Sequence, residues 1–229
     1  MILPYQVDVP MERIPIANWV LIAFTILVSV ATFPALHEDA EALPIWMLHG
    51  SGQWASEAGL LGATLTHADT MHLVGNMIFL FVFGNAVNAK LGHTLFLACY
   101  FFFGMVSAYA HGMISDGPAL GASGAIAGIT GMFIIFFSKN DVNVFYWLFL
   151  YQPGNFEVPA WIVVGCYFLK DVIFQIMESA GASESGVALM AHIGGSVAGA
   201  GIAMLLLLTD RIRPTTAEVT VLDMIRGQG

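Results

Sequence analysis

A serine and a histidine able to do acyl-transfer chemistry stand in two apolar stretches of the sequence. Ser123 lies in "GPALGASGAIAGITGMF" and His192 in "ALMAHIGGSVAGA". A hydroxyl becomes a nucleophile when an imidazole within hydrogen-bonding distance accepts its proton. Burial would keep that imidazole neutral and able to act as the base.

Donors for a developing oxyanion are also present. The backbone N–H of Ser123 opens an apolar run, and N–H groups at a helix start favour anions. Gly121 loosens the turn before it. His72 and Asn76 are four residues apart, on one face of a helix, and their side chains could complete an oxyanion hole.

Each of these side chains also has a purely structural explanation. Ser123 could be a packing serine, because Gly124 and Gly128 form a GxxxG pattern. His192 could be a buried histidine that donates to a carbonyl. His72 and Asn76 could form an interhelical hydrogen bond or cap their own helix.

Small residues favour the catalytic interpretation. Gly124 and Gly128 form one stripe, and Ala191, Gly195 and Gly199 form another beside His192. Two such faces let helix backbones approach closely. We therefore expect the two helices to bring Ser123 to His192.

No carboxylate has an obvious place behind His192, so we expect a Ser–His dyad and not a triad. We expect His67, in "LTHADTMH", to organise a loop.

The composition places these residues in a membrane. Of the 229 residues, 58% are hydrophobic and 10% are charged, and the mean hydropathy is +0.78. Soluble domains carry about 25% charged residues. The net charge of -9 argues against nucleic acid as a partner.

A membrane span needs about 20 mostly apolar residues. The sequence predicts an all-α, six-helix membrane bundle in which the fourth span is short. The six predicted spans are Ile16–Leu36, Met71–Leu91, Thr94–Ile114, Ser123–Ser138, Pro159–Met177 and Val187–Leu208. We expect residues 1–15 and 209–229 to be short solvated tails around one membrane domain, residues 16–208.

Two connections are long. The segment His37–Thr70 contains tryptophans, prolines and glycines, which predicts a partly immersed first loop. The segment Asn140–Glu157 is too short to span and is rich in aromatic and β-branched residues. It predicts an interfacial hairpin that turns at Gln152–Asn155.

Positive charges predict the orientation. With the N-terminus inside, one side of the membrane receives Arg13, Lys90, Lys139, Arg211, Arg213 and Arg226. The loops on the other side carry acids and no Lys or Arg, as the positive-inside rule requires. Lys170, within the fifth span, is expected to pair with Asp171 or to line a polar pocket. Both termini are then cytoplasmic.

This topology brings the polar groups to one depth. Spans two, four and six all run from the outer face inward. His72 lies in the first turn of span two, Ser123 opens span four, and His192 lies about five residues into span six. Since a helix rises 1.5 Å per residue, the groups lie at a similar level below the outer face.

These residues resemble those of the rhomboid intramembrane serine proteases. The resemblance rests on "HADTMHLVGNMIFL", "GASGAIAG" and "AHIGG", in this order on spans two, four and six. It implies that Ser123 is the nucleophile and His192 the general base, while His72 and Asn76 help to bind the oxyanion. It also implies transmembrane helices as substrates, lateral entry beside spans two and five, and no cofactor or metal.

The sequence departs from the family pattern at three places. "VNAKLG" has Asn88 where many relatives have an acid, and Ala127 stands where many place an aromatic ring on the histidine. Trp54 is followed by Ala55, so the Trp-Arg pair of some members is absent.

Two other functions remain to be separated from proteolysis. One is a non-catalytic rhomboid-like protein that binds transmembrane clients. The other is a transporter or metal permease that uses His67, His72 and His192, although metal sites usually have further His, Cys or carboxylate ligands nearby and only Asp69 is close. The small size predicts a prokaryotic plasma membrane.

Overall fold

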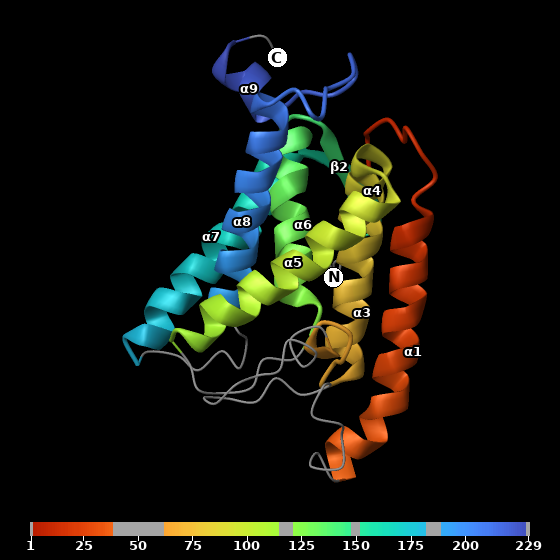
Figure 1. The fold of residues 1–229 in the computed structure, drawn as a ribbon, viewed down its shortest axis with the longest axis vertical. Helices are drawn as coiled ribbons and strands as arrows, with labels where there is room; N and C mark the ends of the chain where they lie inside the picture. Colours follow the sequence, from red (N-terminus) through yellow and green to blue (C-terminus); the bar gives the residue numbers. More distant parts are fainter. Residues whose placement is uncertain (1, 39–61, 115–120, 148–151, 182–188, 228–229) are drawn as a thin grey trace.

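The computed structural model describes residues 2–38, 62–114, 121–147, 152–181 and 189–227. Helical segments make up most of it (Figure 1). They are α1 (Ile16–Glu38), a continuous run of α3 (Thr70–Phe79), η2 (Leu80–Gly84) and α4 (Asn85–Leu91), then α5 (His93–Gly112), α6 (Ser123–Phe136), α7 (Ala160–Ser179) and α8 (Leu189–Leu208).

Each predicted span corresponds to one of these helical segments, and the ends differ by no more than two residues. Five of the segments are long and apolar enough to cross a membrane: Ile16–Ala35, Thr70–Leu91, His93–Gly112, Ala160–Met177 and Leu189–Leu208. The remaining one, α6, has 14 residues and is short, as expected. That all six cross the membrane stays a prediction. The predicted first loop lies largely outside the described residues.

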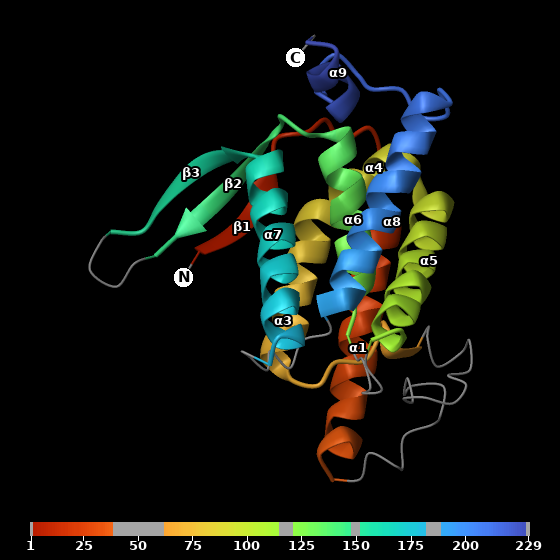
Figure 2. The ribbon, with the colours of Figure 1, turned by 90° about the vertical axis from the view of Figure 1, so that its left-hand side faces the viewer.

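The short helix α6 lies at the centre of the bundle (Figures 1 and 2). It contacts α3, α5, α7 and α8, and most of its residues are buried. A helix that is apolar on all sides is stable only when neighbours surround it. Phe133 of α6 packs edge-on against Phe83 of η2, with ring centroids 5.0 Å apart. The chain thus places the start of α6, with Ser123, between other helices.

A three-stranded antiparallel sheet lies beside the bundle (Figure 2). Its order is β1 (Ile2–Val7), β2 (Asp141–Tyr146), β3 (Gly154–Pro159). The predicted hairpin is confirmed by the pairing of β2 with β3, although Gly154 and Asn155 belong to β3 and not to the turn. The expectation of a solvated tail before Pro15 is wrong for β1, which pairs with β2 and buries Val7.

The π-helical segment η2 accepts a hydrogen bond from a polar side chain of α1. A π-turn leaves a backbone carbonyl without its usual intrahelical partner. Asn18 donates from Nδ2 to the carbonyl of Leu80 at 2.8 Å and to Oδ1 of Asn85 at 2.8 Å. Its own backbone N–H donates to Oδ1 of Asn88 at 3.2 Å. These buried bonds hold α1 against the α3–α4 segment.

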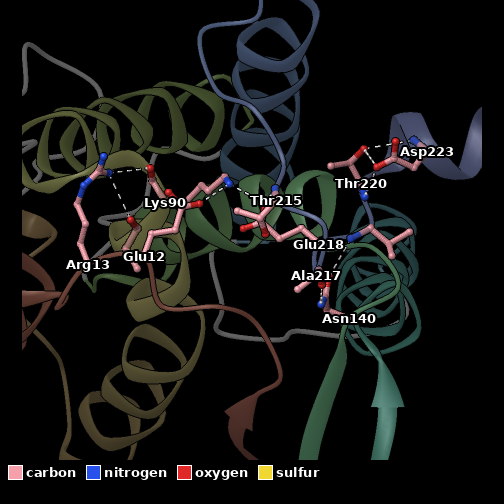
Figure 3. Close-up of polar contacts among 11 residues, drawn as sticks. Glu12, Arg13, Lys90, Asn140, Thr215, Ala217, Glu218, Thr220 and Asp223 are labelled. Atoms are coloured by element: carbon pink, nitrogen blue, oxygen red, sulfur yellow. Dashed lines mark hydrogen bonds and ion pairs between the residues drawn. The ribbon is translucent and has the colours of Figure 1, made fainter. Parts of the chain in front are cut away.

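The C-terminal segment folds back onto one end of the bundle (Figure 3). Lys90 of α4 forms ion pairs with Glu12 and with Glu218, the latter at 2.6 Å, and the side chains of Lys90 and Glu218 are almost fully buried. Asn140, after α6, donates to the carbonyl of Ala217 at 2.9 Å. The expected solvated tail is therefore wrong for this part of the chain. It includes the short helix α9 (Val221–Ile225), which Thr220 caps.

Candidate active site

A cavity of about 260 Å³ opens between α3, α6, α7 and α8. Its wall is mainly apolar, but it includes the four polar side chains that the sequence singles out. They come from three separate helices: His72 and Asn76, Ser123, and His192. The structure therefore brings the predicted residues together.

Ser123 is the first residue of α6, after a turn that only glycine can make comfortably. Gly121 has φ +120°, and its N–H donates to the carbonyl of Ala63 at 2.9 Å. A Cβ at this position would lie 2.7 Å from Cε1 of His72. The bare backbone of Gly121 therefore lets the start of α6 approach the His72 ring.

The small-residue stripes make the contact between α6 and α8. A Cβ added at Gly195 would overlap the carbonyl oxygen of Gly124, and one at Gly199 would overlap that of Gly128. This helix pair is the most extensive of the bundle. The predicted close approach is confirmed, and it places the start of α6 beside the His192 turn of α8.

Ser123 and His192 share the cavity without a hydrogen bond between them. Nε2 of His192 is buried and has no hydrogen-bond partner among the described residues. Both side chains line the same wall. The other ring nitrogen, Nδ1, has a partner of its own on α7, so Nε2 is the nitrogen available to the serine.

A carboxylate does lie behind His192, contrary to expectation. Oδ2 of Asp171, on α7, is 3.0 Å from Nδ1 of His192. The second oxygen, Oδ1, is 3.0 Å from Nζ of Lys170, which confirms the predicted pairing of these neighbours. Asp171, His192 and Ser123 all line the cavity.

The sequence contained a signal for Asp171. An ionisable residue inside a span is a functional candidate by default. Span five runs outward, and Asp171 lies six residues before its predicted end at Met177, whereas His192 lies five residues after the predicted start of span six at Val187. The two side chains could have been placed at one depth, but the rotation of α7 that aims one at the other depends on packing.

His67 is fully buried and connects the first loop to Asn76. Its Nε2 lies 2.9 Å from Nδ2 of Asn76, which can only donate, so Nε2 accepts. Its Nδ1 then carries the proton and donates to Oγ of Ser29 at 2.9 Å. Burial, with a smaller contribution from nearby His72, lowers the pKa of His67 to about 4 and keeps the ring neutral. His67 therefore fixes the Asn76 amide.

The first turn of α3 is also held from the loop side. Asp69 is its N-cap and accepts from the backbone N–H of His72 at 2.8 Å. This hydrogen bond lowers the pKa of Asp69. The ring of His67 meets that of His72 edge to face, with centroids 5.3 Å apart. The cap and the ring contact together position His72 at the cavity.

The departures from the family pattern have defined places. Ala127, in the position where relatives carry a ring, lines the cavity. Asn88 is buried at the other end of the bundle, where it accepts from Asn18.

Within the described part of the chain, no three His, Cys, Asp or Glu side chains gather as a metal site would require.

Comparison with known proteins identifies the family. Residues 52–209 match the Rhomboid domain. The chain is also 30% identical over 167 residues to "Rhomboid protein 1, mitochondrial" of Saccharomyces cerevisiae, an alignment that covers 67% of this chain and 43% of that relative. The chain thus spans less than half the length of the relative. It belongs to the rhomboid family and is an integral membrane protein.

Proposed function

We propose that this protein is an intramembrane serine endopeptidase that hydrolyses peptide bonds in or near transmembrane segments of membrane proteins. The observation that carries the proposal is the shared cavity. One cavity inside an apolar bundle is lined by a serine at a helix start, by two side-chain donors and by a histidine. The buried Nε2 of this histidine has no partner in the part of the chain that the structure describes.

The reaction follows from the roles that these groups can take. Nε2 of His192 accepts the proton of Ser123 as Oγ attacks the scissile carbonyl. The oxyanion accepts hydrogen bonds from the backbone N–H of Ser123 and from the side chains of His72 and Asn76. His192 then protonates the leaving amine, and water attacks the acyl-enzyme with His192 again as base. No step requires a cofactor.

Substrates would reach the cavity from the lipid. The cavity wall includes residues of α3 and α7. The rings of Phe79 on α3 and Tyr167 on α7 meet edge to face, with centroids 4.9 Å apart. A transmembrane helix with small or helix-breaking residues could unwind between these helices. We further propose that both termini face the cytoplasm of a prokaryotic plasma membrane, an orientation supported by the one-sided distribution of Lys and Arg.

The test is cleavage of a single-span model substrate in proteoliposomes. We expect Ser123→Ala to abolish cleavage and labelling by a fluorophosphonate, while the protein stays monodisperse. Ser179→Ala makes the same chemical change at the exposed end of α7 and should leave both signals unchanged. Cleavage by Ser123→Ala at the wild-type rate would exclude the proposal.

The missing Ser123–His192 hydrogen bond gives one reason to test a second function, a non-catalytic rhomboid-like protein that binds transmembrane clients. That function predicts no fluorophosphonate labelling of the wild-type protein. It also predicts that a Ser123→Ala/His192→Ala double variant handles clients as the wild type does.

A further inference from the structure

We propose that Asp171 positions His192 for catalysis, so that the site works as a Ser123–His192–Asp171 triad. This inference rests on the proposed function. Asp171 does not touch the reacting atoms; it acts through the imidazole and is therefore a positioning residue.

The contact between Asp171 and His192 has the geometry of a charge-assisted hydrogen bond. Oδ2 lies 3.0 Å from Nδ1, and the bond joins α7 to α8. Both side chains are largely shielded, with 12% of the Asp171 side chain and 16% of the His192 side chain exposed. Such bonds to an ionised group are roughly twice as strong as neutral ones, so the contact can hold the ring in one orientation.

This contact also selects the tautomer of His192. A carboxylate can only accept, so Nδ1 must carry the proton. The neutral ring then has its lone pair on Nε2. Nε2 is the buried nitrogen that lacks a hydrogen-bond partner among the described residues and that belongs to the wall shared with Ser123. The tautomer that Asp171 favours is therefore the one that can accept the serine proton.

The charge of Asp171 is itself supported. Nζ of Lys170 lies 3.0 Å from Oδ1 of Asp171, and the Lys170 ammonium also sits 5.7 Å from the centroid of the Tyr167 ring. A lone carboxylate in an apolar environment would be costly. With Lys170 on one oxygen and His192 on the other, the anion can persist inside a span.

The carboxylate would then act during the attack. The O–H bond of Ser123 breaks, an N–H bond forms at Nε2, and Oγ bonds to the carbonyl carbon while the π electrons move to oxygen. The imidazolium that results lies against the Asp171 carboxylate, which stabilises it. The proton on Nδ1 stays on the ring, as in serine proteases with a triad.

A purely structural role of the Asp171–His192 contact predicts other effects than a positioning role. The same contact could merely tie α7 to α8, in which case its loss would lower stability or weaken substrate binding without slowing the chemistry at Ser123. The rate at which a small fluorophosphonate labels Ser123 separates the two roles, because labelling needs an activated serine and no transmembrane substrate.

The experiment compares Asp171→Asn, Asp171→Gln and Asp171→Glu in the full chain in proteoliposomes. Labelling rate, kcat and KM are measured for each. We expect Asp171→Asn and Asp171→Gln to lower the labelling rate and kcat by roughly 10²- to 10⁴-fold with little change in KM. Asp171→Glu keeps the carboxylate and should stay within about tenfold of the wild type. Asp210→Asn, at an exposed residue with φ 53° that asparagine tolerates, is the matched control and should change nothing.

Several results would overturn the inference. The first is an Asp171→Asn variant that is labelled at the wild-type rate. The second is equal labelling rates of Asp171→Glu and Asp171→Gln. The third is a rise in KM with kcat and the labelling rate unchanged. If Asp171→Asn is not monodisperse, the labelling rates of Asp171→Glu and Asp171→Gln alone decide whether the carboxylate is needed. Cleavage by Ser123→Ala would instead refute the proposed function; an inactive Ser123→Ala beside a fully active Asp171→Asn refutes only the triad.

Discussion

The Cα of Gly195 on α8 faces the carbonyl oxygen of Gly124 on α6 so closely that a Cβ there would overlap it. The two residues lie one turn or less from His192 and Ser123. The contact between the backbones therefore sets the separation of the proposed nucleophile and its base.

We predict that Gly195→Ala pushes α8 away from α6. Overpacking typically costs about 1–3 kcal/mol, and here the neighbour is backbone that cannot move aside. The displacement should also reduce cleavage by at least about tenfold, because a misplacement near 1 Å can cost about 10²-fold. Gly201→Ala, on the same helix with no atom within 4 Å of its added Cβ, is the control. Equal activity and melting temperature of the two variants would contradict the prediction.

Gly121→Ala should disturb the side of the cavity that we propose binds the oxyanion. The residue has φ +120°, and its Cβ would lie 2.7 Å from Cε1 of His72. Backbone strain of this kind costs about 1–3 kcal/mol, and the His72 ring must move. We expect kcat to fall more than KM rises. Gly181→Ala also places alanine at a positive φ, +70°, but with nothing within 4 Å. Its activity should match that of the wild type; a matching loss would show that strain alone is responsible.

His67 should make the stability of the protein depend on pH. Its folded-state pKa of about 4 lies below the ordinary value of 6.5. The unfolded chain therefore binds the proton first as the pH falls, and stability is lost between about pH 6.5 and pH 4. The loss from this group is roughly 3 kcal/mol.

The measurement is thermal unfolding in detergent across that pH range. His67→Gln cannot titrate, so the difference in melting temperature between wild type and variant should shrink as the pH falls from 7 to 4. A difference that stays constant would show that His67 takes up its proton equally in both states.

Lys90→Met should destabilise the end of the bundle where the C-terminal segment docks (Figure 3). The change leaves the buried Glu218 without its cation, since Lys90 Nζ lies 2.6 Å from Oε2. Removing one partner of a buried ion pair costs about 3–5 kcal/mol. Adding Glu218→Gln to Lys90→Met should recover part of the loss, because the stranded charge is gone.

Exposed Arg211→Met serves as the control for losing a positive charge, and its unfolding should be close to that of the wild type. If Lys90→Met and the double variant unfold at the same temperature, the unpaired Glu218 carboxylate does not destabilise the protein, and the prediction is wrong.

The helices were predictable because each span is a local property: a long apolar run needs no knowledge of its neighbours. The hairpin was predictable for the same reason. The strand β1 was not, because "ILPYQV" becomes a strand only through β2, far along the chain. The shared cavity of Ser123 and His192 was predictable from their depth and from the glycine stripes. The contact of Asp171 with His192 was not, because it depends on the rotation of α7, which packing determines.

The pairing of β1 with β2 also sets an order of assembly. The strand Ile2–Val7 is synthesised before α1, but its partner Asp141–Tyr146 is synthesised only after α6. During biosynthesis β1 therefore stays unpaired until β2 has been made. Its backbone N–H and C=O groups are meanwhile bound to water or to a chaperone. The sheet can close only once most of the bundle has been made, so its closure marks a late step in the maturation of the protein.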